Sequence, residues 1–379
     1  MKNSVPAYIF SIVLLFLAPS VSKAGYFSLG EKSCVWTTNF TDKTNGNEFY
    51  FPIAFDINLN PDFSFYGFSQ FGIGNYFSTQ SDPNTIHVSN LSDSILGTEL
   101  RFNNFSLPAL LNIGVNFPTG NTSWETEEIT ANVPVIFMDS RYHGRGLGVN
   151  VMYGLTFPSG NTELGVACGY SYSGAFNTGT IGSASGDDVK FGDSYFVSLS
   201  HVMTFEKNKR QYLRLSAYSF LPTQLNEQDS YQPGLNLNGS YSWVNPTGLS
   251  IDVGAQYFFA SKRLDLSAGK LAQESNAYYA PKLYLIPTVP VGDLELVGDF
   301  KYILPNDYPL SDVLHEGGGI LAGFEPELKF GLDGTSDLKV NAGYDFILHR
   351  DVPANESGTT FTDAYYNMFT FGATYEVKL

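Results

Sequence analysis

Histidine and serine are the residue types of this chain whose spacing could support hydrolysis. His87-Val88-Ser89 places a histidine two positions before a serine, and a histidine that reaches a serine hydroxyl activates it as a nucleophile. Three further histidines in or beside predicted loops show no metal-ligand spacing: His143, His315 and His349. No Walker or dinucleotide glycine motif is present. The sequence therefore predicts no metal and no cofactor, and it leaves His87 and Ser89 as the one catalytic candidate.

Charged side chains within alternating segments suggest a second kind of chemistry, the selection of solutes in a pore. Acids and bases that face a water-filled lumen set a field across it and bias which solutes pass. The alternative for each residue is a wall charge that lumen water solvates or a neighbour pairs. The residues expected to face inward are Glu99, Arg101, Arg214, Asp252, Glu295, Asp299, Lys301, Glu325, Glu327, Lys329, Lys339 and Asp345.

The elements that would carry these residues have a period of two. Between 249 and 256, apolar residues occupy the odd positions and polar or small ones the even positions. Such alternation indicates strands with one apolar and one polar face, and segments of this length match the roughly 9–11 residues that cross a bilayer at a tilt. Sixteen segments show it, at about 49–59, 63–73, 95–103, 109–117, 129–137, 147–157, 163–173, 193–205, 211–221, 235–243, 249–259, 278–286, 293–304, 319–330, 337–348 and 367–379.

Composition agrees with strands in a membrane. The chain has 379 residues, of which 15% are charged and 15% aromatic, whereas a typical soluble domain has about 25% charged residues. The net charge of −16 argues against a nucleic-acid partner. Cys34 and Cys168 are too few for a disulfide scaffold or a cysteine zinc module. A soluble sandwich would also alternate, but numerous long strands with aromatic ends favour a closed barrel.

The first 24 residues have the features of a secretory signal peptide. Lys2 precedes an apolar run from Tyr8 to Ala18, and Ser22-Lys23-Ala24 supplies small residues before a predicted cleavage at Gly25. The apolar run is shorter than the about 20 residues of a spanning helix. We therefore expect a signal peptide at 1–24 and a single mature domain at 25–379.

The lengths of the links between the predicted strands constrain the topology. After residue 147, short and long links alternate, as in a barrel with short periplasmic turns and longer extracellular loops. The N-terminal third breaks this rule, and counting 33–41 and 84–91 as strands restores it. The alternation thus predicts sixteen strands and the link lengths favour eighteen. Residues 25–48 are then an N-terminal plug or contain the first strand. Both counts predict an all-β fold, a transmembrane antiparallel up-and-down β-barrel.

The last strand carries a recognisable pattern. Residues 367–379 read NMFTFGATYEVKL, in which Thr370, Gly372, Tyr375 and Val377 have the spacing polar-x-Gly-x-x-hydrophobic-x-hydrophobic. This resembles the assembly signal of bacterial outer-membrane β-barrels, with Leu379 in place of the usual terminal aromatic. The resemblance implies insertion into the outer membrane of a Gram-negative bacterium by the barrel-assembly machinery.

The catalytic candidate has a resemblance of its own. His87-Val88-Ser89-Asn90-Leu91 is similar to the His-x-Ser-Asn-Gly motif of outer-membrane phospholipases, in which the histidine activates the serine. Leu91 stands in place of the glycine. The alternation also points Ile86 and Val88 toward lipid, which would turn His87 and Ser89 into the lumen, the wrong side for cleaving lipid.

Together these features predict a porin-like channel for the passive diffusion of small polar or amphipathic solutes, and not an enzyme. An outer-membrane lipid hydrolase and a non-conducting adhesion or structural barrel are the alternatives. The expected partners are outer-membrane lipid, lipopolysaccharide, the barrel-assembly machinery and small solutes. Assembly into a homo-oligomer stays open.

Overall fold

The computed structural model describes residues 24–38, 44–78, 85–120, 146–177, 188–190, 192–205, 209–225, 228–231, 234–260, 264–265, 273–274, 278–304, 306–307, 315–316, 319–332, 335–353 and 361–378. Nearly all of these residues are in strands, and they contain no helix with the length and hydropathy to cross a bilayer.

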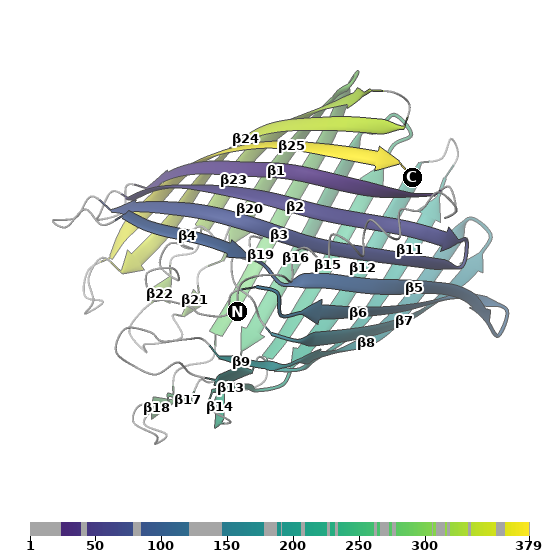
Figure 1. The fold of residues 1–379 in the computed structure, drawn as a ribbon, viewed down its shortest axis with the longest axis horizontal. Helices are drawn as coiled ribbons and strands as arrows, with labels where there is room; N and C mark the ends of the chain where they lie inside the picture. The colour runs from purple at the N-terminus through teal and green to yellow at the C-terminus, as the bar shows by residue number, and fades with distance from the viewer. Residues whose placement is uncertain are drawn as a thin grey trace, which may run out of the picture.

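One large antiparallel sheet dominates the molecule (Figure 1). Its strands are β1 (Ala24–Thr38), β2 (Thr44–Asn60), β3 (Phe63–Ser78), β4 (Thr85–Leu91), β5 (Ser94–Asn104), β6 (Leu107–Phe117), β7 (Gly148–Ser159), β8 (Thr162–Ser173), β11 (Ser194–Thr204), β12 (Arg210–Phe220), β15 (Gly234–Val244), β16 (Ser250–Ala260), β19 (Tyr278–Val291), β20 (Leu294–Ile303), β23 (Gly319–Gly331), β24 (Ser336–Pro353) and β25 (Phe361–Lys378).

The sheet closes on itself. β1 pairs with β2 on one side and with β25 on the other, in a register that joins Tyr26 to Lys378 and Thr38 to Tyr366. β4 and β5 both pair with β3, at Phe71–Phe77 and Phe63–Phe68, so they share one place in the wall. The barrel therefore has sixteen strand positions, which confirms the predicted fold class and the lower of the two predicted counts. Closure leaves no unpaired sheet edge to face lipid.

The sixteen strands are not the sixteen that alternation singled out. Residues 24–38 lie in the wall as β1, whereas the sequence pattern there was weak. The predicted strand 129–137 lies outside the described residues, and β6 pairs directly with β7 through Ala109–Asn116. The observed order of the N-terminal third differs from the predicted one because β1 is in the wall and β6 lies directly next to β7.

The barrel has two unlike ends. The tight links 61–62, 105–106, 160–161 and 292–293 lie at one end with the start of β1 and the end of β25, and we call it the turn end (right in Figure 1). The longer links lie at the other end, which we call the loop end, where the small strands β13 (Thr223–Leu225), β14 (Gln228–Tyr231), β17 (Leu264–Asp265) and β18 (Gln273–Glu274) are found. In outer-membrane barrels the turn end is periplasmic.

A bulge interrupts the wall between β4 and β5. Three residues, Ser92, Asp93 and Ser94, lie opposite two residues of β3, Ser69 and Gln70. The Asp93 carboxylate fixes the bulge, because it accepts hydrogen bonds from the Gly120 N–H at 3.0 Å and the Asn116 side chain at 2.8 Å. One extra residue reverses which face each side chain of β4 occupies relative to β5.

A carboxylate also anchors a long link at the loop end. Asp193, which follows β10 (Asp188–Lys190), accepts hydrogen bonds from the Tyr170 hydroxyl at 2.6 Å and the Ser173 N–H at 3.0 Å, and Lys190 lies 3.8 Å away. Burial alone would raise the pKa of Asp193, but these donors hold the pKa below its usual range. The charged form therefore ties the 174–193 link to β8.

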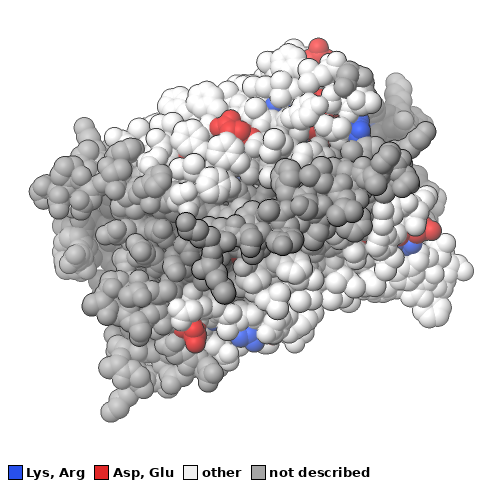
Figure 2. All heavy atoms as spheres, viewed as in Figure 1, with Lys and Arg blue, Asp and Glu red and all other residues white. Residues whose placement is uncertain are grey.

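The outer face of the barrel is apolar. Most of the exposed large hydrophobic side chains recur at alternate positions along their strands, for example Leu213 and Leu215 on β12 and Val197 and Leu199 on β11. Aromatic rings pack across strands on this face, including Phe51 on Phe71 at 6.4 Å and Tyr170 on Tyr195 at 5.0 Å. In the view of Figure 2, most of the described surface along the strands is uncharged. We call this face the apolar belt, and it suits contact with lipid.

Candidate functional site

The inner face consists of the residues that alternate with the apolar belt. Its charged members follow from the strand registers, because residues directly opposite each other on paired strands share a face. The registers place on this face every charged residue that the sequence predicted to point inward: Glu99, Arg101, Arg214, Asp252, Glu295, Asp299, Lys301, Glu325, Glu327, Lys329, Lys339 and Asp345.

Two of the inward bases pair with an acid on their own strand. Lys301 Nζ lies 2.6 Å from Asp299 Oδ2, and Arg101 forms an ion pair with Glu99. In each pair the two residues are two positions apart, so both side chains leave the same face of the strand. The pairs keep charges of both signs in the wall and reduce the local net field.

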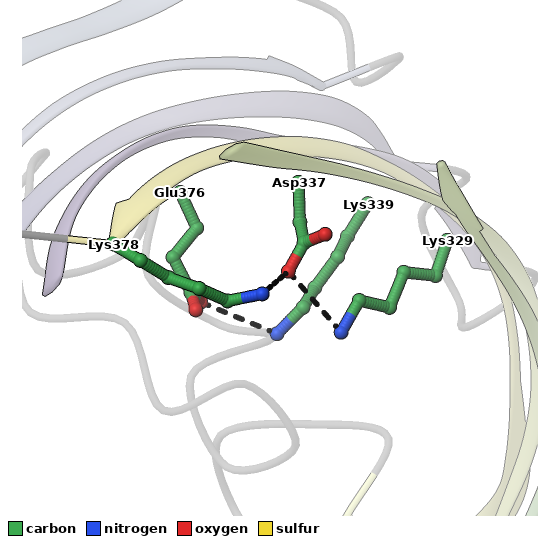
Figure 3. Close-up of polar contacts among 5 residues, drawn as sticks. All are labelled: Lys329, Asp337, Lys339, Glu376 and Lys378. Carbon is green, nitrogen blue, oxygen red and sulfur yellow. Dashed lines mark hydrogen bonds and ion pairs between the residues drawn. The ribbon is translucent and has the colours of Figure 1, made fainter. Parts of the chain in front are cut away.

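Two ion-pair groups lie side by side in Figure 3, one around Asp337 and one between Glu376 and Lys339, and we call them together the turn-end cluster: Lys329, Asp337, Lys339, Glu376 and Lys378. Asp337 Oδ2 lies 2.9 Å from Lys378 Nζ and 3.3 Å from Lys329 Nζ, while Glu376 Oε2 lies 3.4 Å from Lys339 Nζ. The side chains come from β23, β24 and β25 and point toward the interior of the barrel (Figure 3).

The register explains why the cluster is made of diagonal pairs. Lys329 lies directly opposite Lys339, and Asp337 lies directly opposite Glu376, so the direct cross-strand neighbours have like charges. Such neighbours repel, and each charge reaches a diagonal neighbour of opposite sign instead. Within the cluster three bases share two acids, and a further acid, Glu327, lies one pleat from Lys329 on the same face of β23.

Sequence reasoning found two members of this cluster and missed three. Lys329 and Lys339 were among the predicted inward residues, whereas Asp337, Glu376 and Lys378 were not. The signal was present in the alternation, because Asp337 has the same parity as Lys339, and Glu376 and Lys378 alternate with the outward Tyr375 and Val377. Lys32 was missed for a different reason, since β1 was not recognised as a complete strand.

Farther from the turn end, the inner face of β20, β23 and β24 carries acidic residues. Asp299, Gly323 and Asp345 lie in one row across β20, β23 and β24. The glycine makes room for the carboxylate, because a Cβ atom at position 323 would lie 2.0 Å from Asp345 Oδ1. Glu325 accepts a hydrogen bond from Asn341 one pleat closer to the turn end. Three carboxylates therefore line the middle of this wall.

Exposure changes along the wall from the turn end to the loop end. The side chains of Lys329 and Lys378 are 52% and 53% exposed. Toward the loop end the inner-face residues Trp36, Ile347 and Met368 are 2%, 3% and 4% exposed. The lumen along β1, β23, β24 and β25 is therefore wet near the turns and packed near the loops.

The structure corrects the predicted orientation of the catalytic candidate. Ser89 lies opposite Ile73 of β3, a residue of the apolar belt, and it is exposed. Its side chain therefore faces outward and not into the lumen. The bulge at Ser92–Asp93 causes the error, because it shifts the alternation of β4 by one residue relative to β5. His87 pairs with Asn75 in the same backbone register.

The described residues show no other arrangement for catalysis by a metal or a thiol. No group of three or more histidine, cysteine, aspartate or glutamate side chains in the described part of the chain is placed to hold a metal ion. Cys34 and Cys168 are free thiols. They belong to β1 and β8, which are not neighbours in the sheet, and Cys168 lies on the outer face opposite Val197.

Comparison with known proteins gives similar folds at low sequence identity. No protein-family model and no curated protein matches the chain. Among solved structures it is similar to an outer-membrane channel, COG4313, from Pseudomonas putida F1 (8% identity, 94% of this chain and 97% of that chain, TM-score 0.39). It is also similar to OccAB1 of Acinetobacter baumannii (9%, 95% and 99%, 0.48) and OprB of Pseudomonas putida (11%, 99% and 97%, 0.43).

The chain's own architecture defines its class. A closed sixteen-strand barrel with an apolar outer face and a charged inner face pairs its backbone groups within the wall while it presents apolar side chains to lipid. This protein is a multi-pass transmembrane β-barrel.

Proposed function

We propose that the protein is a channel for passive diffusion of small polar or amphipathic solutes across the outer membrane. The observation that supports this most strongly is the wet, charged inner face at the turn end, where Lys329 and Lys378 are half exposed within a barrel of sixteen strands. A barrel of this size is wide enough for an aqueous path. Size exclusion limits which solutes pass, and the packed inner face of β1, β23, β24 and β25 near the loop end narrows the path on one side.

The wall charge favours cations. On the inner face of the described strands the acids outnumber the bases. The acids are Glu48, Asp56, Glu99, Glu163, Asp252, Glu295, Asp299, Glu325, Glu327, Asp337, Asp345 and Glu376; the bases are Lys32, Arg101, Arg210, Arg214, Lys282, Lys301, Lys329, Lys339 and Lys378. The net charge of −16 for the whole chain acts in the same direction. Cationic and neutral polar solutes are therefore the proposed cargo.

The biogenesis that we propose follows from the two ends of the chain. The signal peptide at 1–24 directs export, and the pattern at 367–379 recruits the barrel-assembly machinery. The folded barrel then contacts outer-membrane lipid through its belt and lipopolysaccharide near its loop end. No feature of the acidic chain supports nucleic-acid binding.

Liposome swelling tests this function. The mature chain is refolded into vesicles, and the rate of swelling is followed for neutral sugars of increasing size and for cationic and anionic amino acids of matched size. We expect rates that fall with size and that are higher for the cation than for the anion. Vesicles with correctly folded protein that swell no faster than empty vesicles would contradict the proposal.

The lipid-hydrolase alternative gains one observation from the structure, the outward position of Ser89. The pattern still lacks the glycine at position 91. Release of fatty acid from phospholipid vesicles, measured for the wild type and for Ser89→Ala, separates the two functions. We expect no release from either protein, and release that Ser89→Ala abolishes would establish the hydrolase.

A further inference from the structure

The outer face of β1 carries a carboxylate at the middle of the apolar belt. Lys32 and Cys34 belong to the inner face, so Glu31 belongs to the outer face. Its neighbours on that face of β1 are apolar or small, and Glu31 is the central residue of the series Phe27, Leu29, Glu31, Ser33 and Val35. Leu29 and Val35 are 48% and 46% exposed, as expected for side chains that face lipid.

The position of Glu31 is singular among the barrel-strand residues whose side chains the structure describes. The registers place every other charged residue of this set on the inner face. The described side chains of the outer face therefore offer Glu31 no lysine or arginine of its own chain, and the outer-face His201 belongs to β11, which does not pair with β1. Ionisable residues at membrane depth are costly and are commonly kept because a partner uses them.

The surroundings of Glu31 leave the carboxylate open to a neighbour. Ala373 lies directly opposite it across the β1–β25 seam and has only a methyl group. Ser33, one pleat toward the loop end, turns its hydroxyl to the Phe371 carbonyl at 3.5 Å. We call Glu31, Ser33 and Ala373 the seam patch. It is a small patch with polar groups between Phe371 and Tyr375, which are 51% and 41% exposed.

We propose that the seam patch docks a different membrane-embedded chain that presents a lysine or arginine to Glu31. Charge complementarity indicates the chemistry of the partner: the patch supplies a carboxylate beside small side chains, and a long basic side chain can pair with that carboxylate. A second copy of this chain would bring another carboxylate and, among its described outer-face side chains, a histidine (His201) but no lysine or arginine. The seam patch therefore suits a hetero-complex and not a dimer of barrels.

The native mass of the protein extracted from membranes tests the proposal. Wild-type protein is extracted from its own outer membrane with a mild detergent, and its mass is compared with that of the purified chain refolded alone. We expect a complex with a fixed ratio of a second polypeptide from membranes and a single barrel for the refolded chain. Glu31→Leu should reduce the complex at least tenfold and Glu31→Asp should retain it. Thr98→Leu, a matched outer-face change on β5, should leave it intact.

Stability of the isolated chain supplies an independent readout. Glu31→Leu should raise the urea midpoint of the refolded barrel, because it replaces a lone charge in the belt with an apolar side chain. If Glu31 instead stabilised the fold, Glu31→Leu would lower the urea midpoint. A lower midpoint, a native mass equal to one barrel, a complex of two copies of this chain, or a complex that survives Glu31→Leu would each overturn the proposal. Conductance of the refolded channel should not change, so this test is independent of the proposed transport.

Discussion

The two ends of one lumen wall behave differently although the same strands run through both. Near the loop end of β1, β24 and β25, the inner positions hold Trp36, Ile347 and Met368, which are almost completely buried. Near the turn end of β23, β24 and β25, they hold the turn-end cluster, in which Lys329 and Lys378 are half exposed. Alternation is the same in both regions. Period two thus decides which side of the wall a residue faces, and residue type decides whether that side is packed or wet.

The largest effect is expected where a charge enters the packed region. Ile347→Asp should destabilise the barrel by about 3–5 kcal/mol, the cost of a buried charge without a partner. Glu327→Ile, a matched change at an inner position near the turn end, should change the free energy of unfolding by less than about 1 kcal/mol. Urea unfolding of the refolded proteins measures both. Equal losses would mean that the two regions do not differ.

Asp193, which anchors the link at the loop end, should contribute less to the free energy of unfolding. Asp193→Asn removes the charged acceptor of the Tyr170 hydroxyl and the Ser173 N–H, and we expect a loss of about 1–2 kcal/mol at pH 7. The pKa of Asp193 is lowered in the folded state, so its contribution is present above the unfolded pKa of about 4 and disappears as the pH falls through the folded value. Wild type and variant should therefore converge in acid, and a gap that persists there would exclude this cause.

A smaller effect with the opposite sign is expected at the turn end. The link between β5 and β6 holds Phe105 and Ser106 at φ values of 49° and 64°, a conformation that favours asparagine and glycine. Replacing the pair with Asn-Gly should stabilise the barrel by about 1 kcal/mol. A thermal or urea midpoint that falls would show that the exposed Phe105 ring contributes through a contact of its own.

The turn-end cluster should affect selectivity more than stability. Asp337 is buried, but its partners Lys329 and Lys378 are half exposed and stay solvated without it, so Asp337→Ala should cost no more than about 1 kcal/mol. The same change leaves three lysines with one acid and should lower the preference for cations, which a reversal potential measures. Lys339→Ala should raise the preference for cations. Identical shifts of the reversal potential in both variants would show that the cluster does not face the ion path.

Sequence alone predicts the fold and the charged inner face because both depend on alternation, which is local. The outward face of residues 249–259 and the inward face of Glu325 and Lys339 follow from counting by two. The bulge at Ser92–Asp93 breaks that count, because one extra residue reverses the faces of β4 and therefore the orientation of Ser89. The local sequence pattern does not predict the bulge, because the bulge depends on hydrogen bonds from Asn116 and Gly120 to Asp93, which is distant from them in sequence.

The first strand shows a second limit of alternation. Glu31 and Ser33 interrupt the apolar series of β1, so the segment looks too polar for a wall strand until its pairing with β25 is known. Burial is a third limit. Trp36 and Met368 have the same parity as exposed lumen residues, and only the packing in three dimensions shows that this part of the wall is covered.

Single-channel recording of the refolded mature chain in a planar bilayer tests the central claim most directly. The account predicts stepwise openings and a reversal potential that indicates a preference for cations, reduced in Asp337→Ala. A barrel that unfolds in urea as a folded protein does, yet gives no openings at any voltage, would contradict the claim that the charged lumen is a path for solutes.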